Sequence, residues 1–379
     1  MKMQFIDLKK QYEVLKKDID AGISKVLSDG HYIGGEEVKQ LSQELAAYTG
    51  AKYCLTCANG TDALTIALRC LGVGKGDAVF VPSFTFFASA ETPAQEGASC
   101  VFVDVDERTF NMDAQKLESA VEKVLKEGKL CPKCIVAVDL FGQPAAYPAI
   151  RKVAEKYGLS IVEDGAQGFG GSIGRKKACS FGDISTTSFF PAKPLGCYGD
   201  GGAIFTDNEE YYKLMCSLAV HGKGSFKYDN VRLGYNSRLD TLQAAILLPK
   251  LHAFEKYELK DRNAVAKRYT DALGKKFKTP VVPEGYESSW AQYTLILDSK
   301  EERESIQAKL KEAGIPTMVY YPVPMHKQTA FKDCGADAET LHVSEYLCER
   351  VMSIPMHPYL DEKTQDTIIN ALLSCRTKE

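Results

Sequence analysis

One lysine carries the strongest chemical signal in the sequence. Lys193 stands in a turn between Pro191 and Pro194, after the segment 185–190 and before the segment 202–206, and both segments have the pattern of buried strands. A lysine in such a turn is either exposed, as most lysines are, or partly desolvated. Partial desolvation makes the ammonium lose its proton more readily, and a neutral amine forms a Schiff base with an aldehyde.

A carboxylate upstream favours the desolvated interpretation. Asp164 ends the apolar segment 159–163 and opens the glycine-containing turn that follows it. A Schiff-base lysine and a carboxylate beside a pyridinium nitrogen are the pair that pyridoxal phosphate chemistry requires. Glu163 is the alternative carboxylate, but the alternation of side chains along a strand places it on the face opposite Asp164. The sequence therefore predicts Asp164 as the partner of the ring nitrogen.

The turn at Gly60 is a second candidate site. A strand expected at 52–57 leads through this turn into a helix that opens at Thr61. The first amide groups of a helix have no intrahelical acceptor, and this end of the helix dipole is positive, so such a turn binds anions. An ordinary helix capped by the Thr61 side chain is the alternative.

The elements that position these residues alternate between apolar strands and helices. This order is typical of an open, mostly parallel sheet with helices on both faces. Ligands of such sheets bind beyond the carboxyl ends of the strands, which is where the turns at Gly60, Asp164 and 82–87 fall. The expected strands are 52–57, 78–82, 100–104, 134–139, 159–163, 202–206, 291–297 and 316–320, and the expected helices are 7–29, 36–49, 88–96, 113–127, 147–157, 209–219, 301–313 and one from about 361.

Length and composition indicate a globular protein of two domains. The chain has 379 residues, of which 45% are hydrophobic and 26% charged, and we place a large domain at 1–245 and a smaller α+β domain at 246–379. A formal net charge of −3 makes nucleic acid an unsuitable partner. No apolar run reaches the roughly 18 residues of a membrane span, and the first residues lack the apolar core of a signal peptide. We expect a soluble cytoplasmic protein.

Twelve cysteines include two pairs with metal-site or redox spacing. Cys54 and Cys57 lie in an expected strand, so their side chains point to opposite faces, and the other pair, Cys131 and Cys134, is distant in sequence. We expect small buried thiols at both pairs, and no metal site, because a chain of this length needs no disulfides or zinc to fold. A zinc or thiol-redox protein is the alternative.

Several motifs in the right order resemble a known family. Asp164 is followed by Gln167, Ser188 stands five residues before Lys193, and a Gly-Asp-Gly-Gly sequence precedes the segment 236–240. These motifs resemble the sugar aminotransferases of the DegT/DnrJ/EryC1/StrS family over nearly the whole chain. The sequence around Lys193 is most similar to those of the branch that aminates C3 of nucleotide-linked 3-keto sugars.

The resemblance implies a fold type I transferase with pyridoxal 5′-phosphate held as an internal aldimine on Lys193. Asp164 would keep the pyridine nitrogen protonated, and Lys193 would act as general acid and base once it is free. Gln167 would lie on the side of the phenolic oxygen. Phe86 matches the aromatic ring that relatives place over the pyridine, whereas we expect its neighbours Phe84 and Phe87 to belong to the core.

The resemblance also implies which residues bind the cofactor phosphate and the substrate. Gly60, Thr61 and Ser188 would bind the cofactor phosphate. Asn236 would also bind this phosphate, from a loop that crosses to the neighbouring subunit. The resemblance thus implies a homodimer with shared active sites. Arg238 of the same loop would reach the substrate nucleotide.

Tyr320 and Tyr321 match the substrate-side loop, where relatives acting on glucuronate-derived sugars often have His-Tyr-Pro. Because this chain has Tyr-Tyr-Pro, the sequence leaves open whether the sugar carries a C6 carboxylate. We expect His326, on the same segment, to be a structural residue.

The expected function is transfer of an amino group from L-glutamate to C3 of a UDP-linked 3-keto sugar, a 2-acetamido hexose or hexuronate. Such a product serves surface polysaccharide synthesis, for example lipopolysaccharide O-antigen. The alternatives are a 4-keto sugar aminotransferase of the same family, an amino-acid aminotransferase, and a non-catalytic regulator that binds pyridoxal phosphate.

Overall fold

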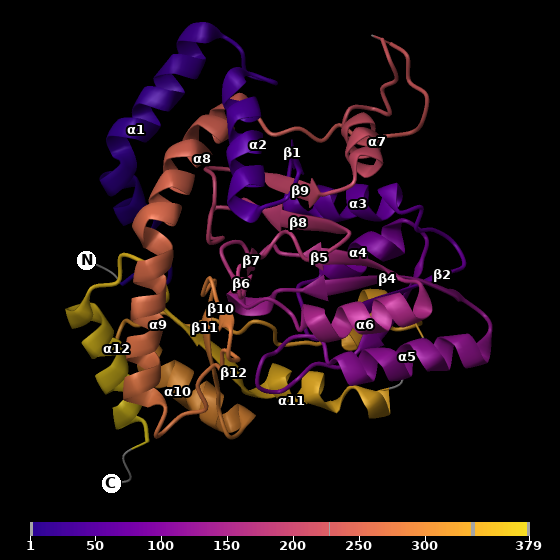
Figure 1. The fold of residues 1–379 in the computed structure, drawn as a ribbon. Coiled ribbons are helices and arrows are strands. Elements are labelled where there is room, and N and C mark those ends of the chain that lie inside the picture. The colour runs from indigo at the N-terminus through magenta and orange to yellow at the C-terminus, as the bar shows by residue number, and fades with distance from the viewer. Residues whose placement is uncertain (1–2, 227, 335–337, 377–379) are drawn as a thin grey trace.

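A seven-stranded sheet forms the centre of the protein in a computed structural model that describes residues 3–226, 228–334 and 338–376 (Figure 1). The strand order is β1-β9-β8-β5-β4-β2-β3. Neighbouring strands pair in parallel except where β9 pairs with β1 and β8, so the predicted mostly parallel sheet is confirmed. The strands are β1 (Tyr53–Cys57), β2 (Asp77–Pro82), β3 (Ser99–Val103), β4 (Cys131–Val138), β5 (Ser160–Asp164), β8 (Ile184–Ser188) and β9 (Gly202–Thr206).

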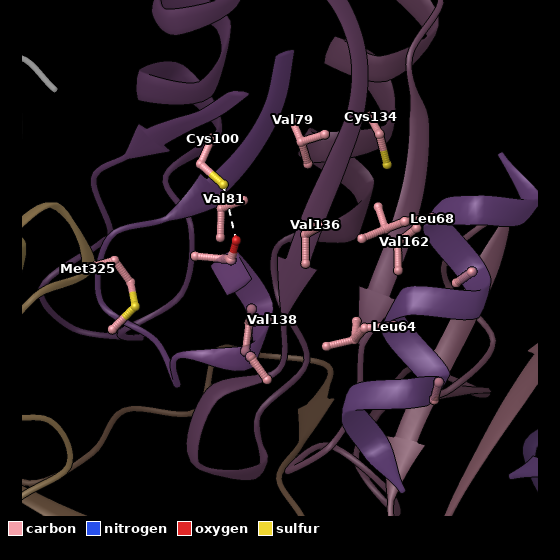
Figure 2. Packing of buried hydrophobic residues seen from close by; sticks show 14 of the residues in the cluster. Leu64, Leu68, Val79, Val81, Cys100, Cys134, Val136, Val138, Val162 and Met325 are labelled. Carbon is pink, nitrogen blue, oxygen red and sulfur yellow. Dashed lines mark hydrogen bonds between the residues drawn. The ribbon is translucent and has the colours of Figure 1, made fainter. Parts of the chain in front are cut away.

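Helices cover both faces of this sheet because its strands are apolar on both sides. Helices α3, α4 and α7 cover one face, and α5, α6, α2 and α8 cover the other. Figure 2 shows Leu64 and Leu68 of α3 facing Val79, Val136 and Val162 of the strands. The bounds are α2 (Glu36–Thr49), α3 (Gly60–Cys70), α4 (Ala88–Gln95), α5 (Ala114–Glu127), α6 (Tyr147–Tyr157), α7 (Glu209–Ala219) and α8 (Thr241–Ala253).

The C-terminal part forms a second core around a two-stranded antiparallel sheet of β11 and β12. Tyr269 of α9, Leu310 of α10 and Ile368 of α12 pack in this core. The elements are the π-helix Phe254–Glu258, which continues α8 into α9 (Leu259–Leu273), then β11 (Tyr293–Ile296), α10 (Lys300–Glu312), α11 (His342–Arg350), β12 (Val351–Ile354) and α12 (Glu362–Ser374).

The remaining elements are the N-terminal helix α1 and a small separate sheet. At the start of the chain, α1 (Leu8–Asp29) packs along α8, which runs through residue 245, so the domain boundary at 245 stays a prediction. The short strands β6 (Ser172–Ile173), β7 (Lys176–Lys177) and β10 (Tyr286–Glu287) form a separate sheet. None of the helices in the described part of the chain is long and apolar enough to cross a membrane.

The predicted strand at 316–320 is wrong. Only Met318 pairs in this segment, through a single antiparallel bridge to Ser353 of β12. Pro316 has no N–H to donate, and Tyr320 packs instead against the core of the large sheet. The segment therefore leaves the small sheet and runs toward the large one.

Candidate active site

A cavity of about 460 Å³ opens at the carboxyl ends of the parallel strands. The last residues of three neighbouring strands line it, Val138 of β4, Asp164 of β5 and Ser188 of β8. This is the edge where open α/β sheets bind ligands. The structure brings nine of the predicted site residues to this cavity, namely Gly60, Thr61, Phe86, Asp164, Gln167, Ser188, Lys193, Tyr320 and Tyr321.

Lys193 lines the cavity with a half-buried side chain. Its backbone N–H donates to the Phe190 carbonyl at 2.9 Å, which closes the turn predicted from the two prolines. Burial lowers the pKa of the Lys193 ammonium, and the nearby Asp164 carboxylate acts in the opposite direction. Of the two interpretations of Lys193, the structure therefore supports the partly desolvated amine and not the exposed turn residue.

Asp164 is buried and held by two hydrogen bonds. Its Oδ2 accepts from the Ser89 hydroxyl at 2.7 Å, and its Oδ1 accepts from the Ala166 amide at 3.2 Å. Burial raises the pKa of the Asp164 carboxyl, whereas these donors and Lys193 act to lower it. Since hydrogen bonds to a carboxylate favour its charged form, Ser89 and Ala166 support an ionised Asp164 at the cavity.

Glu163 points away from the cavity, as strand alternation predicts. Its carboxylate accepts hydrogen bonds from the Phe181 amide at 2.6 Å and the Ser185 hydroxyl at 2.7 Å. Burial raises the pKa of the Glu163 carboxyl. Glu163 therefore anchors the loop before β8, and Asp164 is the carboxylate that is available to a ligand.

The start of helix α3 forms the second wall. The Asn59 side chain accepts from the Asp62 amide at 2.8 Å and caps the helix, so capping by Thr61 is wrong. The amide groups of Gly60 and Thr61 lie in the first helical turn, where no intrahelical acceptor exists. A Cβ atom added to Gly60 would lie 2.7 Å from the Ser188 Cβ. Glycine at this position lets the helix end approach β8 closely enough for both to face one anion.

Aromatic rings form the third wall. Phe86 is 52% exposed, and its ring centroid lies 6.1 Å from that of Tyr321. The Tyr321 hydroxyl accepts from the Gln167 amide at 3.0 Å, and Gln167 Oε1 accepts from the Phe141 amide at 2.7 Å. Phe84 is buried in the core as predicted. Phe86 therefore offers an exposed aromatic ring to a planar ligand in the cavity that Asp164 also lines.

The sequence matches the DegT/DnrJ/EryC1/StrS aminotransferase family over residues 13–373. The chain belongs to this family. This match confirms the predicted family, and an aminotransferase function with pyridoxal phosphate as cofactor follows from it.

Three curated relatives are similar over almost their full lengths. A UDP-2-acetamido-2-deoxy-3-oxo-D-glucuronate aminotransferase of Pseudomonas aeruginosa is 48% identical over 98% of this chain and 99% of its own. A pleiotropic regulatory protein of Geobacillus stearothermophilus is 40% identical over 98% of each chain. A UDP-N-acetyl-3-dehydro-alpha-D-glucosamine 3-aminotransferase of Acidithiobacillus ferrooxidans is 39% identical over 94% of each chain.

Solved structures agree with this family assignment. A DegT/DnrJ/EryC1/StrS aminotransferase from Brucella abortus has a TM-score of 0.97 and 48% identity, covering 99% of this chain and all of that one. The pyridoxal phosphate form of a sugar aminotransferase from Streptococcus pneumoniae has a TM-score of 0.87 and 28% identity, covering 95% of this chain and 96% of that one. The predicted fold type I architecture is thereby confirmed.

The cavity of this family member has the donor set that pyridoxal phosphate needs. Asp164 can pair with a pyridinium nitrogen, Lys193 supplies the amine, and the Gly60–Thr61 amides face the cavity beside Ser188. Because Gly60 has no side chain, its backbone lies directly beside the Ser188 side chain. The residues present therefore fit the cofactor.

Gly60→Ala should weaken cofactor binding. The added methyl group would meet the Ser188 Cβ at 2.7 Å, and overpacking of this kind costs about 1–3 kcal/mol. If this cost falls on the cofactor complex, it corresponds to about 5- to 150-fold in affinity. Titration of the apoprotein with pyridoxal phosphate, followed by absorbance, measures this effect. Gly74→Ala is the control, because the only atom within 4 Å of its added Cβ would be 3.9 Å away. Equal affinities of the two variants would contradict the proposed phosphate corner.

Two predicted site residues lie apart from the cavity of their own chain. Asn236 and Arg238 are exposed and bonded to each other, on the loop that follows α7. This loop projects beyond the body of the sheet (Figure 1). Arg238 instead lines a separate groove with Ile33 and Leu239. A single chain thus does not assemble all the residues that we expected at one site.

The residues of the cavity and its supports that sequence reasoning missed include four polar ones. Asn59 could have been found, because an asparagine just before a helix that starts with glycine is a typical N-cap. Ser89 and Thr85, whose hydroxyls lie 3.1 Å apart behind Asp164, have no local signal. Gln292 directly precedes β11 and also has no local signal, since only the packing of distant segments brings it to the cavity.

His326 is buried and satisfied on both ring nitrogens, in agreement with the structural role that we expected. Its Nδ1 lies 2.6 Å from the Ser83 hydroxyl, and its Nε2 lies 3.0 Å from the Glu345 carboxylate. The imidazole therefore ties the loop after β2, which carries Phe86, to the segment that carries Tyr321.

The cysteine prediction is correct for three of the four residues. Cys54, Cys57 and Cys134 are buried, but Cys131 is exposed, because it begins β4 at the surface. Cys54 and Cys57 pack in different cores, as expected for opposite faces of a strand. Within the described ranges, no group of three or more His, Cys, Asp or Glu residues is arranged to hold a metal ion.

Proposed function

We propose that the protein transfers the amino group of L-glutamate to C3 of a UDP-linked 3-keto sugar for surface polysaccharide synthesis, such as that of lipopolysaccharide O-antigen. The sugar carries a 2-acetamido group and is a hexose or a hexuronate. The observation that carries this proposal is the Lys193–Asp164 pair in the cavity of a chain that is 48% identical to an aminotransferase named for such a substrate.

The roles of the two central residues follow from their surroundings. When bound, pyridoxal phosphate supplies an electron sink for the carbon that loses a proton. Asp164 keeps a proton on the ring nitrogen through an ion pair. Lys193, with its lowered pKa, would hold and release the transferred proton at Nζ as general acid and base. Phe86 and Gln167 also line the cavity and would contact the cofactor ring when it is bound.

We further propose a homodimer with shared active sites. Asn236 and Arg238 do not line the cavity of their own chain, and their loop exposes large apolar side chains, including Leu233 at 88% and Val231 at 55%. In a dimer, Asn236 would join Ser188 and Thr61 at the phosphate of the second copy, and Arg238 would face the nucleotide. The protein would act in the cytoplasm, because its twelve cysteines are free thiols and thiols persist in a reducing compartment.

The first test is an absorption spectrum of the protein with pyridoxal phosphate. Excess glutamate should bleach the visible band, and a UDP-linked 2-acetamido-3-keto sugar should restore it. Restoration by a 4-keto nucleotide sugar alone would assign the chain to the other branch. If no amino donor bleaches the visible band, the result would favour a non-catalytic regulator that binds pyridoxal phosphate.

The shared site is tested by mixing two inactive variants. Lys193→Ala and Asn236→Ala dimers, exchanged by mild denaturation, should regain roughly one quarter of the wild-type activity, because half of the dimers are mixed and each has one intact site. Mixed dimers without activity would mean that Asn236 serves the cavity of its own chain, and an active Asn236→Ala variant would mean that it serves no site.

A further inference from the structure

Lys193 is carried by the loop that connects β8 to β9, residues 189–201, which we call the lysine loop. The Phe190 carbonyl accepts from the Lys193 amide and closes its turn. A Cβ atom added to Gly196 would lie 2.6 Å from this same carbonyl oxygen and 2.5 Å from that of Pro191. The returning half of the lysine loop therefore lies directly against the turn, and a displacement of Gly196 would displace the turn that holds Lys193.

Two side chains of α8 hold this returning half. Lys250 donates from Nζ to the Gly196 carbonyl. The Gln243 side chain accepts from the Tyr198 amide at 2.9 Å and donates to the Tyr198 carbonyl at 3.4 Å. The Lys250 Nζ also lies 4.8 Å from the centroid of the Tyr198 ring, which is within the range of a cation–π interaction. Because Gln243 and Lys250 are seven positions apart on one helix, they lie on the same face, and α8 holds the loop at two points.

The residue type at position 250 indicates that this contact is more than core packing. Lys250 is only 1% exposed. Burial lowers the pKa of its ammonium to about 8, whereas the Glu258 carboxylate acts in the opposite direction. Burying an amine costs free energy unless it is bonded, and a methionine of similar length would fill the space without that cost. Lys250 does not line the cavity, so it affects the reaction only through the lysine loop.

We propose that Lys250, together with Gln243, is a positioning residue that holds the Lys193 amine at the cavity. A group that transfers protons must stay within hydrogen-bond reach of the atom it serves, and a misplacement of about 1 Å costs about 10²-fold in rate. This inference rests on the proposed role of Lys193. It applies to both half-reactions, because the same amine serves the amino donor and the sugar.

The test is Lys250→Met, which keeps the length of the side chain and removes the donor. The kcat for amino transfer should fall about 10- to 100-fold, with nearly unchanged KM values for glutamate and for the sugar. The second measurement is amide hydrogen exchange of the protein without cofactor. Exchange in the lysine loop should become faster, whereas exchange in β5 should stay as in the wild type. Gln243→Met should change both quantities in the same direction, and it carries the test if Lys250→Met does not fold.

The matched control is Ile246→Ala, which truncates a buried side chain of the same helix. Ile246 packs in a cluster with Leu15 and Ile19 of α1. This variant should lower the melting temperature, but it should keep the kcat per bound cofactor and the exchange of the lysine loop close to the wild-type values. It therefore separates a loss of stability from a loss of positioning.

Two outcomes would overturn the inference. A normal kcat in Lys250→Met, with or without faster loop exchange, would mean that Lys250 only stabilises the fold. A reduced kcat with unchanged loop exchange would mean that Lys250 acts by another route. If Lys193→Ala kept its turnover, the proposed role of Lys193 would fail, and the exchange measurement would still report whether Lys250 holds the loop.

Discussion

Replacing Lys193 by alanine is expected to abolish amino transfer while the protein stays folded. The substitution removes the amine that links the cofactor and that moves protons, and loss of a positioned general acid–base alone costs about 10²- to 10⁴-fold in rate. Lys193 is half-buried in a turn closed by its backbone, not by its side chain, so the turn should survive. Steady-state transfer from glutamate and the melting temperature measure the two effects.

The control is Lys311→Ala, which removes an exposed lysine of α10 and should change neither quantity. Partial recovery of Lys193→Ala by an added small amine would support the assignment to the amine itself. Steady-state turnover near the wild-type level would contradict the catalytic role of Lys193.

Asp164→Asn should reduce turnover on the order of 10²- to 10³-fold, the range seen when one preorganised electrostatic group is removed. Asparagine has nearly the same shape and can still accept from Ser89, but it carries no charge to hold a proton on the ring nitrogen. It also removes the carboxylate that raises the pKa of Lys193. Turnover and the spectrum of the bound cofactor are the measurements.

Glu163→Gln is the control for Asp164→Asn, because it removes a different buried carboxylate from the same strand. Glu163 binds the Phe181 amide and Ser185 on the other face of β5. Its variant should therefore lower the melting temperature and keep most of the turnover per bound cofactor. If Glu163→Gln lost the activity and Asp164→Asn kept it, the ring nitrogen would pair with Glu163.

The sequence predicted the central sheet well because its signals are local. Alternating apolar strands and helices with glycine stops need only neighbouring residues to be recognised. Most bounds of the elements before residue 220 differ from the prediction by three residues or fewer. The segment 316–320 failed because its pairing depends on a distant partner. Met318 bridges Ser353, but proline at 316 and the packing of Tyr320 prevent a strand.

Candidate reactive residues could also be predicted from the sequence, because they lie at strand ends and in turns. Lys193 and Asp164 could be proposed from their residue types, their neighbours and the alternation that turns Glu163 away. Such features identify which residues face one edge of a parallel sheet. They do not tell which other side chains complete that edge.

Only the tertiary structure decided how these residues are supported and what else faces the cavity. Ser89 reaches Asp164 across 75 positions of sequence, and Ser83 reaches His326 across 243. Gln292 lines the cavity only because the preceding residues 289–291 pack closely against Gly142. The sequence by itself determined the family and the sheet and nominated Lys193 and Asp164 as the reactive pair, since local spacing encodes these features. Hydrogen bonds and packing between distant segments leave no such spacing, so the fold alone revealed the supports of Asp164 and the bond from Lys250 to the loop that carries Lys193.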